Sequence, residues 1–294
     1  MQCLKPYIPI LDPKSLADYR KDGMLVGRFS AYREKHRDLV FPHRHSFYHF
    51  VVFTRASGSY SIDFSRFEAK AWEVYFMAPG QIHEWAFREE VEGYVVNFTE
   101  SFFQSLLLRP AFFDRFPFFS GHASQSVLRI PENERGFVQE VCERLLSAYD
   151  EAGPAGVDQE RVSLLYLLML FGQYASPHDD GRASSYNDTL LRNFQQLIEQ
   201  HYPVMRLPKD YADMLFVTPN HLNALCKEYL GMQAGEVIRN RVLLEAKRLL
   251  VATDKPVSAI AAHLGFNDSS YFTKFFKKAL YLTPEEFRRD KDIQ

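Results

Sequence analysis

Between residues 24 and 100 the chain alternates apolar and polar positions in short runs. Clear examples are residues 48–53, 59–64, 73–77 and 93–98, which are separated by Gly, Pro and charged turns. Alternation with a period of two is typical of strands that bury one face, and close spacing of such runs is typical of all-β domains. The pattern therefore predicts a β-barrel or β-sandwich in the first third of the chain.

Apolar positions repeat at helical spacing in two later stretches, residues 132–148 and 161–174. In the first stretch the shared face consists of Phe137, Val141, Leu145 and Ala148. The second is apolar around most of its circumference, so it must be covered on more than one side. It is either a core helix of its own domain or a dimerisation helix that exposes Leu164 or Leu168. The aromatic stretch 112–119 is too apolar for a free loop and should pack the strands against these helices.

A polar, turn-rich segment at residues 176–186 is typical of a linker. Of the 26 Phe residues, 19 precede residue 187, which also favours a boundary there. Beyond it the pattern predicts helices at residues 188–201, 208–215, 220–227, 234–252, 257–264 and 269–278. The start and stop signals are Thr218-Pro219 and Asn267-Asp268 as N-caps, with Gly231 and Gly265 after helices.

The pattern of a short helix, a tight turn and a second helix occurs twice in this region. This pattern is typical of a helix-turn-helix. The helix expected between the two units, residues 234–252, is about 28 Å long at 1.5 Å per residue. That is close to the ~34 Å of one DNA turn. Two recognition helices at this separation can enter successive major grooves on one face of the duplex.

Composition and charge set bounds but do not decide the function. The chain has 294 residues, enough for about two domains. Residues 187–294 carry 15 Lys and Arg against 13 Asp and Glu, whereas residues 1–186 carry 20 against 24. The three cysteines are far apart, and the start of the chain is unlike a signal peptide, so we expect a cytoplasmic protein. Because the sequence has no apolar run of ~20 residues, we expect no membrane partner.

Residues 259–278, followed by 283–288, resemble the signature of the AraC/XylS family of bacterial regulators. Further matches are His221-Leu222, Lys227, Gly231 and residues 246–250, so the resemblance covers about residues 187–290. It implies sequence-specific DNA binding by a two-helix-turn-helix unit. The sequence departs from the family at Ala224, where a long polar residue is common, and at Tyr281, where Gly is usual.

The exposed faces of the two expected recognition helices suggest which side chains contact DNA. The predicted DNA-binding residues are Asn220, Asn223, Lys227, Ser269, Ser270, Thr273 and Lys274, because Asn, Ser, Thr and Lys can bond base edges. The cations expected at phosphates, or simply in solvent, are Arg239, Arg241, Lys277 and Lys278.

The N-terminal motifs, residues 41–50 and 79–83, resemble those of cupin barrels. In metal-binding cupins such motifs supply histidines and one glutamate, and here a histidine stands in the glutamate position. Without that carboxylate we expect no metal and no other cofactor, and we assign the residues to effector binding. The predicted effector-binding residues are His43, His45, His49, Tyr60, Trp72, His83 and Trp85.

These features together predict an α+β protein of two domains. Residues 1–175 would form a cupin-like β-barrel with flanking helices, 176–186 a linker, and 187–294 an all-α double helix-turn-helix domain. The expected function is a non-enzymatic transcription regulator that senses a small molecule. Its expected partners are double-stranded promoter DNA, an unidentified effector, a second copy of the chain and RNA polymerase. The rival hypothesis is a metal-dependent cupin enzyme or metal sensor fused to a DNA-targeting domain.

Overall fold

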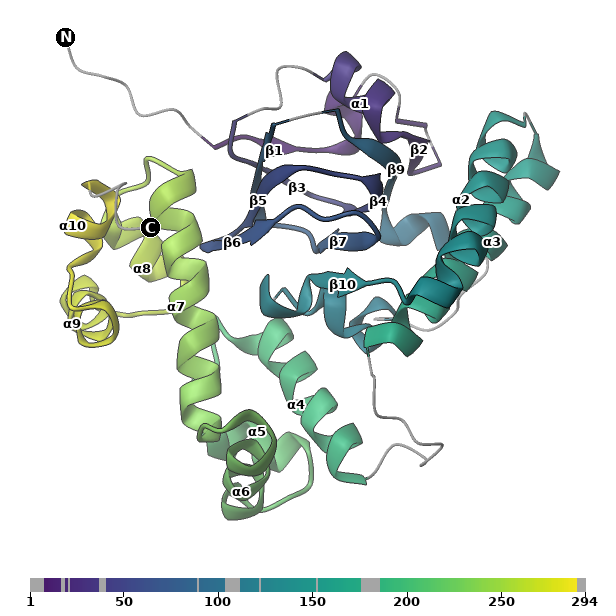
Figure 1. The fold of residues 1–294 in the computed structure, drawn as a ribbon. Coiled ribbons are helices and arrows are strands. Elements are labelled where there is room, and N and C mark those ends of the chain that lie inside the picture. The colour runs from purple at the N-terminus through teal and green to yellow at the C-terminus, as the bar shows by residue number, and fades with distance from the viewer. Residues whose placement is uncertain are drawn as a thin grey trace, which may run out of the picture. The chain divides into compact units, whose positions relative to one another are not determined.

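The computed structural model describes residues 8–16, 19–20, 22–36, 41–88, 90–103, 112–121, 123–151, 153–175 and 186–289. These residues divide into two compact units, one from residue 8 to 175 and the other from 186 to 289 (Figure 1). The expected linker therefore lies, apart from Tyr186, outside the described residues. Among the described helices, none is long and apolar enough to cross a membrane.

The N-terminal unit contains two five-stranded sheets. The first has the order β1 (Ile10–Leu11), β3 (His43–His45), β8 (Ile82–Phe87), β5 (Gly58–Ile62) and β6 (Ser65–Glu68). The second has the order β10 (Val127–Arg129), β7 (Glu73–Met77), β4 (Tyr48–Arg55), β9 (Glu92–Phe98) and β2 (Met24–Arg28). Every pairing is antiparallel except that of β1 with β3. Helix α1 (Phe29–Lys35) follows β2 directly.

The predicted β domain is confirmed, but the expected barrel is not closed. No described strand pairs across from one sheet to the other, so the unit is a two-sheet sandwich with open edges. In β4 of the second sheet, successive side chains point to opposite faces. Val51 and Phe53 fill the space between the sheets with other large side chains, whereas Phe50 and Val52 face the helices on the outside.

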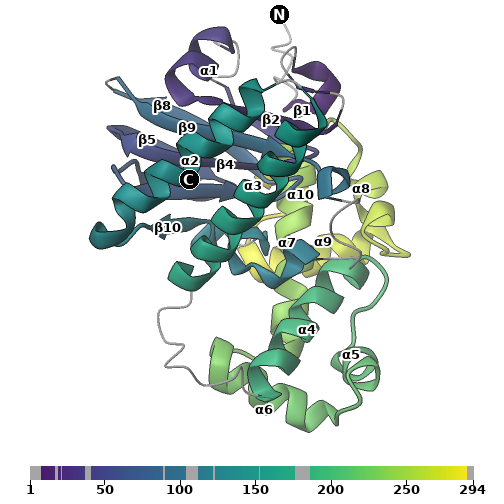
Figure 2. The ribbon, with the colours of Figure 1, turned by 90° about the vertical axis from the view of Figure 1, so that its right-hand side faces the viewer.

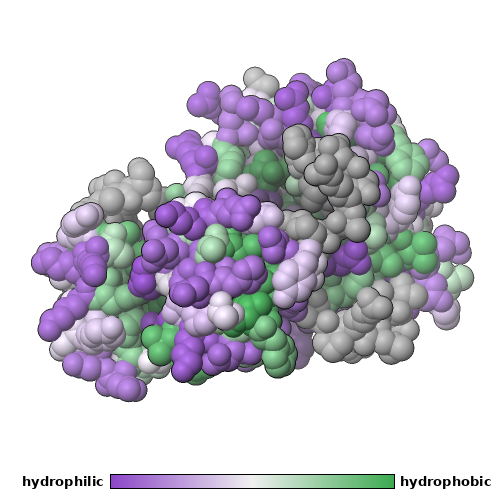
Figure 3. Space-filling view, turned by 90° about the horizontal axis from the view of Figure 1, so that it is seen from below, coloured by the Kyte–Doolittle hydropathy of each residue, from purple (hydrophilic) through white to green (hydrophobic). Residues whose placement is uncertain are grey.

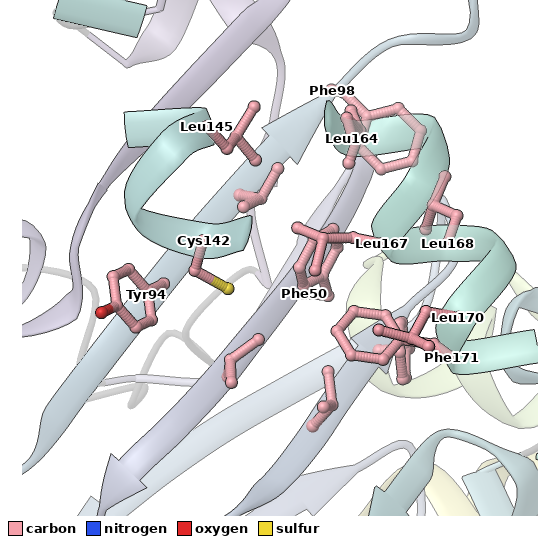
Figure 4. Packing of buried hydrophobic residues seen from close by; sticks show 14 of the residues in the cluster. Phe50, Tyr94, Phe98, Cys142, Leu145, Leu164, Leu167, Leu168, Leu170 and Phe171 are labelled. Atoms are coloured by element: carbon pink, nitrogen blue, oxygen red, sulfur yellow. The ribbon is translucent and has the colours of Figure 1, made fainter. Parts of the chain in front are cut away.

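Helices α2 (Arg135–Asp150) and α3 (Pro154–Ala175) lie across the outer face of the second sheet (Figure 2). The layer between them is apolar and contains Phe50, Phe98, Leu145, Leu167 and Phe171 (Figure 4). The short helices at Phe112–Arg115 and Pro117–Phe119 join it, as expected for the aromatic stretch. Other short helices span Pro13–Ser15, Glu100–Phe103, Ala123–Gln125 and Glu132–Glu134.

The structure corrects the expected exposure of α3. Leu164 and Leu168 have no exposed surface, because both pack into this outer core, so neither is available for a second chain. The expected apolar face of α2 is correct at Val141, Leu145 and Ala148, but Phe137 is 40% exposed.

The C-terminal unit is entirely helical in its described residues. Its helices are α4 (Tyr186–His201), α5 (Pro208–Met214), α6 (Pro219–Leu230), α7 (Ala234–Ala252), α8 (Val257–His263), α9 (Ser269–Leu280) and α10 (Pro284–Arg289). The six predicted helices, α4 to α9, are confirmed within a few residues, whereas α10 was not predicted. Helices α5 and α6 share one core with α4, and α8 and α9 share another with the second half of α7.

Candidate DNA interface and sensor site

Two turns in the C-terminal unit have the same hydrogen-bonding pattern. After α5 the amide of Leu215 donates to the carbonyl of Tyr211, and the amide of Val217 donates to that of Ala212. After α8 the amides of Leu264 and Phe266 donate to the carbonyls of Ile260 and Ala261. Each turn satisfies carbonyls at a helix end and passes through one left-handed residue. The chain thus builds the helix-turn-helix twice.

At each of two equivalent left-handed positions, one helix-turn-helix unit has glycine and the other has an aromatic residue. The turn residue is Phe216 in the first unit (φ 56°) and Gly265 in the second (φ 73°). The residue that ends the recognition helix is Gly231 in the first (φ 70°) and Tyr281 in the second (φ 60°). Phe216 and Tyr281 are 95% and 87% exposed. Their αL conformation costs on the order of 1 kcal/mol each relative to glycine.

Each recognition helix has a side-chain cap at its N-terminus. In α6 the Thr218 hydroxyl accepts from the amide of His221 at 3.2 Å, and in α9 the Asp268 carboxylate accepts from the amide of Ser270 at 2.7 Å. Of the predicted DNA-binding residues, Asn220, Lys227, Ser269, Ser270 and Lys274 are exposed. These five are sterically available to a DNA duplex.

Three of the polar residues considered for DNA contact form hydrogen bonds or ion pairs within the C-terminal unit. Asn223 is half-buried, and its side-chain oxygen accepts from the amide of Ala234, the first residue of α7, at 3.1 Å. The Thr273 hydroxyl donates to the carbonyl of Ser269 one turn earlier. The Arg241 side chain, expected at a phosphate or in solvent, is 10% exposed and ion-paired with Glu199 and Glu245.

The charge of α9 suits a polyanion better than that of α6. Between Ser269 and Leu280 the helix carries Lys274, Lys277 and Lys278 and no acidic residue. All three lysines are exposed. Helix α6 has one lysine beside one glutamate. Tyr271 (66% exposed) and His221 lie on the recognition helices among these residues and were not among the predicted contacts. A selection of contacts by exposed position on the helix, rather than by residue type, would have included Tyr271 and His221.

Within the C-terminal unit, the segment that follows α4 contacts both helix-turn-helix units. Tyr202 packs against both cores of the C-terminal unit, and Arg241 lies over its ring at 4.1 Å. Four residues later, Arg206 lies 4.1 Å from the ring centre of Phe266 and donates to the carbonyl of Leu264. A Cβ at Gly265 would lie 1.9 Å from the carbonyl oxygen of Pro203. These contacts fix the second turn against a segment that precedes the first unit.

On the N-terminal unit, four predicted histidines meet between the two sheets. His43, His45 and His83 come from β3 and β8, where His43 and His83 are direct cross-strand partners. His49 comes from β4 in the other sheet. All four are at most 2% exposed. The spacing His-x-His works because alternate residues of a strand share a face.

Hydrogen bonds and burial set the state of these imidazoles. The His43 Nδ1 lies 2.9 Å from the carbonyl oxygen of Phe41, and the His49 Nδ1 lies 2.6 Å from the amide oxygen of Asn97. Both nitrogens therefore donate, which leaves Nε2 as the basic nitrogen of each ring. Burial lowers the pKa of His49 to about 3 and lowers the pKa values of His45 and His83, an effect that the neighbouring rings add to.

The predicted aromatic residues divide between two places. Trp85 lies beside the histidines, 5.5 Å from His83 and 5.9 Å from His49 between ring centres, and Tyr60 lies 6.1 Å from His83. Trp72 does not join them. It follows β6 with a φ of 64° and packs against the outer core, where Arg135 lies 5.6 Å from its ring centre. The structure therefore brings together six of the seven predicted effector-binding residues.

Two family models match the chain, one for each unit. Residues 211–290 match the model of a helix-turn-helix domain, and residues 27–191, more than half of the chain, match that of an AraC-like ligand binding domain. The chain belongs to the AraC family of transcription regulators. Its two units thus correspond to the family's ligand-binding and helix-turn-helix domains.

Relatives within the AraC family are distant in sequence. The chain is 25% identical over 117 residues to the regulatory protein PocR of Salmonella typhimurium, which spans 40% of this chain and 39% of that protein. It is 21% identical over 242 residues to the arabinose operon regulatory protein of the same organism, with 80% of each chain covered. Among solved structures, the C-terminal domain of AraT from Geobacillus stearothermophilus is 28% identical. It covers 37% of this chain and 92% of its own, with a TM-score of 0.34.

Proposed function

We propose that this AraC-family chain binds promoter DNA in the cytoplasm through α6 and α9, and that a ligand in its N-terminal unit changes that binding. The proposed divisions are residues 1–175 for the cupin-like sensor and dimer unit, 176–186 for the linker and 187–294 for DNA binding. We take the chain to be a regulator and not an enzyme, because its relatives are regulators. We propose RNA polymerase as a further partner, because a regulator bound at a promoter lies close to the polymerase.

One observation carries the proposal: the same turn is built twice, with one helix joining the two units. Helix α7 has 19 residues, so it is about 28 Å long. The contacts of Arg206 with Phe266, and of Arg241 with Tyr202 and Glu199, hold both helix-turn-helix units to the segment after α4 and so favour a fixed relation between the recognition helices. A rigid pair separated by about one turn of DNA requires two half-sites about 10 base pairs apart.

The proposed contacts differ between the two recognition helices. Asn220 and Lys227 on α6, and Ser269, Ser270 and Lys274 on α9, are the exposed side chains that can bond bases or phosphates. We leave Asn223 out of this set because its amide oxygen is already used at the start of α7. The acid-free α9 supplies more of the electrostatic attraction.

A second copy of the chain is proposed to pack on α3, but not through Leu164 or Leu168. The exposed residues of α3 that repeat with spacings of three and four are Gln159, Val162, Tyr166, Met169 and Gln173. This is the spacing of a coiled-coil seam, and its middle is apolar with glutamine at both ends. Phe137 of α2 extends the patch, 5.8 Å from Tyr166 between ring centres. Two copies of such a stripe can cover each other in a symmetric pair.

The test is selection of bound duplexes from a random DNA library with the full chain. The expected winners contain two half-sites about 10 base pairs apart, with a binding constant that falls steeply with salt. The fragment 187–294 should select the same half-sites with lower affinity. Recovery of no sequence preference by the full chain would contradict the proposal.

A further inference from the structure

The first sheet of the N-terminal unit carries a cavity at β5 and β6. Its volume is about 490 Å³, within the ~300–1,000 Å³ that is typical of small-molecule sites. The residues that line it on the β5 side are small, because residues 56–59 are Ala, Ser, Gly and Ser. Longer side chains from β6 and from the end of β8 surround them, so a hollow is left between.

This cavity is separate from the histidine cluster. Tyr60 on β5 is fully buried between the two sheets, 6.1 Å from His83 between ring centres. Neighbouring side chains along a strand point to opposite faces, so Ser59 faces outward. Glu68 on β6 is the direct cross-strand partner of Ser59 and faces outward with it. The cavity and the histidine cluster therefore lie on opposite faces of the same strands.

Two arginine side chains line the cavity without a carboxylate partner. Arg66 on β6 and Arg88 after β8 are exposed, and neither forms an ion pair with a carboxylate of the described residues. The guanidinium of Arg66 donates to the hydroxyl of Ser59 at 2.8 Å, which restricts its position. Glu68, the acidic residue of the lining, pairs with Lys70 at 3.4 Å instead. The two guanidinium groups are therefore free to bind an anion.

Backbone contacts hold the walls of the cavity together. The amide of Ala69 donates to the carbonyl of Gly58, and the amide of Arg88 donates to the carbonyl of Ser57. Gly58 has a φ of 120°, and a Cβ there would lie 2.4 Å from the carbonyl oxygen of Ala86. Only glycine lets β5 and β8 lie this close. Because the backbone around the cavity is fixed, a ligand pays little to order it.

We propose that this cavity binds a sugar phosphate, a small molecule with one phosphate group and several hydroxyl groups. Arg66 and Arg88 bind the phosphate, because the planar guanidinium matches the geometry of phosphate oxygens. The hydroxyl groups of Ser57 and Ser59 and the carboxylate of Glu68 bond the sugar hydroxyls. The inference goes beyond the proposed function, because it adds a second ligand site to the sensor unit.

The charge of the lining favours a phosphate monoester over a polyphosphate or a nucleic acid. The lining has two cations and one anion. A monoester with a charge of about −1.5 to −2 is well matched by the two arginines. A second phosphate group would lie against Glu68, and like charges at short range repel. An uncharged sugar would leave both guanidinium groups unused.

The experiment titrates the full chain with glucose 6-phosphate, fructose 6-phosphate and ribose 5-phosphate, in a phosphate-free buffer at constant ionic strength. Calorimetry should show one saturable site per chain for at least one of the three, with a Kd below about 1 mM. Inorganic phosphate should bind about 10-fold more weakly or less, and glucose should not saturate the site.

Substitutions locate the binding site on the chain. Arg66→Gln and Arg88→Gln should each weaken binding of the tightest sugar phosphate by about 10-fold or more, since each removes a charge-assisted hydrogen bond. Arg55→Gln is the matched control, because Arg55 is 60% exposed and lies outside the lining. Thermal melting shows whether each variant folds, and the ligand should raise the Tm of the wild type and of Arg55→Gln alike.

Three results would overturn the inference. The first is that none of the three sugar phosphates binds the wild-type chain. The second is that folded Arg66→Gln and Arg88→Gln bind as the wild type does. The third is equal affinity for inorganic phosphate, because the serine hydroxyls and Glu68 would then play no part. These assays contain no DNA, so their outcome is independent of promoter binding.

Discussion

The side-chain oxygen of Asn223 accepts a hydrogen bond from the amide of Ala234, 3.1 Å away. The first recognition helix thereby satisfies one of the four unpaired amides at the start of α7, whose own N-cap residue, Gln233, makes no side-chain bond there. A residue that resembles a base-reading asparagine in the sequence thus joins the recognition helix to the helix between the two units.

Replacement of Asn223 by alanine should lower the free energy of unfolding by about 1 kcal/mol, the usual cost of a lost cap. The base preference of the chain should be unchanged, because the Asn223 side-chain oxygen is already bonded to the amide of Ala234. Urea denaturation and selection from a DNA library measure the two effects. The matched control is Asn220→Ala, which should leave stability unchanged and alter DNA binding. The reverse pattern would show that Asn223 reads bases.

The two left-handed turn residues should respond oppositely to substitution. Phe216→Gly removes αL strain from an exposed side chain and should stabilise the C-terminal unit by about 0.5–1 kcal/mol. Gly265→Ala places a Cβ against the Pro203 carbonyl and should destabilise it by more than about 2 kcal/mol. Chemical denaturation of both variants checks this. Equal effects of the same sign would mean that the two turns are not equivalent.

Lys274→Ala should weaken specific binding by about 1–3 kcal/mol if its ammonium group bonds a base. If it contacts a phosphate instead, affinity should fall for all sequences and the slope of log K against log salt should decrease by about 1. Fluorescence anisotropy over a salt series separates these outcomes. The control is Lys70→Ala in the N-terminal unit, whose lysine is 58% exposed and pairs with Glu68. Identical behaviour of the two variants would remove Lys274 from the interface.

Tyr166→Glu should convert the full chain from dimer to folded monomer, because it places a charge in the middle of the apolar stripe of α3. Gln139→Glu on α2 is also exposed and should leave the dimer intact. Sedimentation at tens of micromolar protein measures both. A monomeric wild-type chain under these conditions would show that α3 serves its own core alone.

The C-terminal helices could be predicted because their signals are local. Thr218, Asp268 and Gly265 act within a few residues of their own positions, so capping rules are sufficient to place the helix ends. The bond of Asn223 to α7 could not be predicted because its partner, Ala234, lies on the next helix. Arg241 was expected at a phosphate or in solvent because its partner Glu199 lies 42 residues earlier, on α4, where sequence spacing does not reveal the pairing.

In the N-terminal unit the strands were predictable but their pairing was not. Alternation shows which side chains share a face, and it correctly placed His43 with His45. It does not show whether the last strand closes a barrel, because closure depends on pairing between distant residues. Similarly, the all-round apolar pattern of α3 requires cover without identifying it, and the sheet with α2 supplies that cover for Leu164 and Leu168.

The open sandwich leaves strand edges, and edges invite aggregation because their unpaired amides and carbonyls can extend a sheet into another molecule. The outer strand β6 carries exposed Arg66 and Glu68, so an incoming apolar strand would have to desolvate charge. The edge strands β1 and β10 have only two and three residues, and β2 ends where α1 begins. Short, charged or capped edges give the sensor unit resistance to fibril formation that a closed barrel would obtain from its geometry alone.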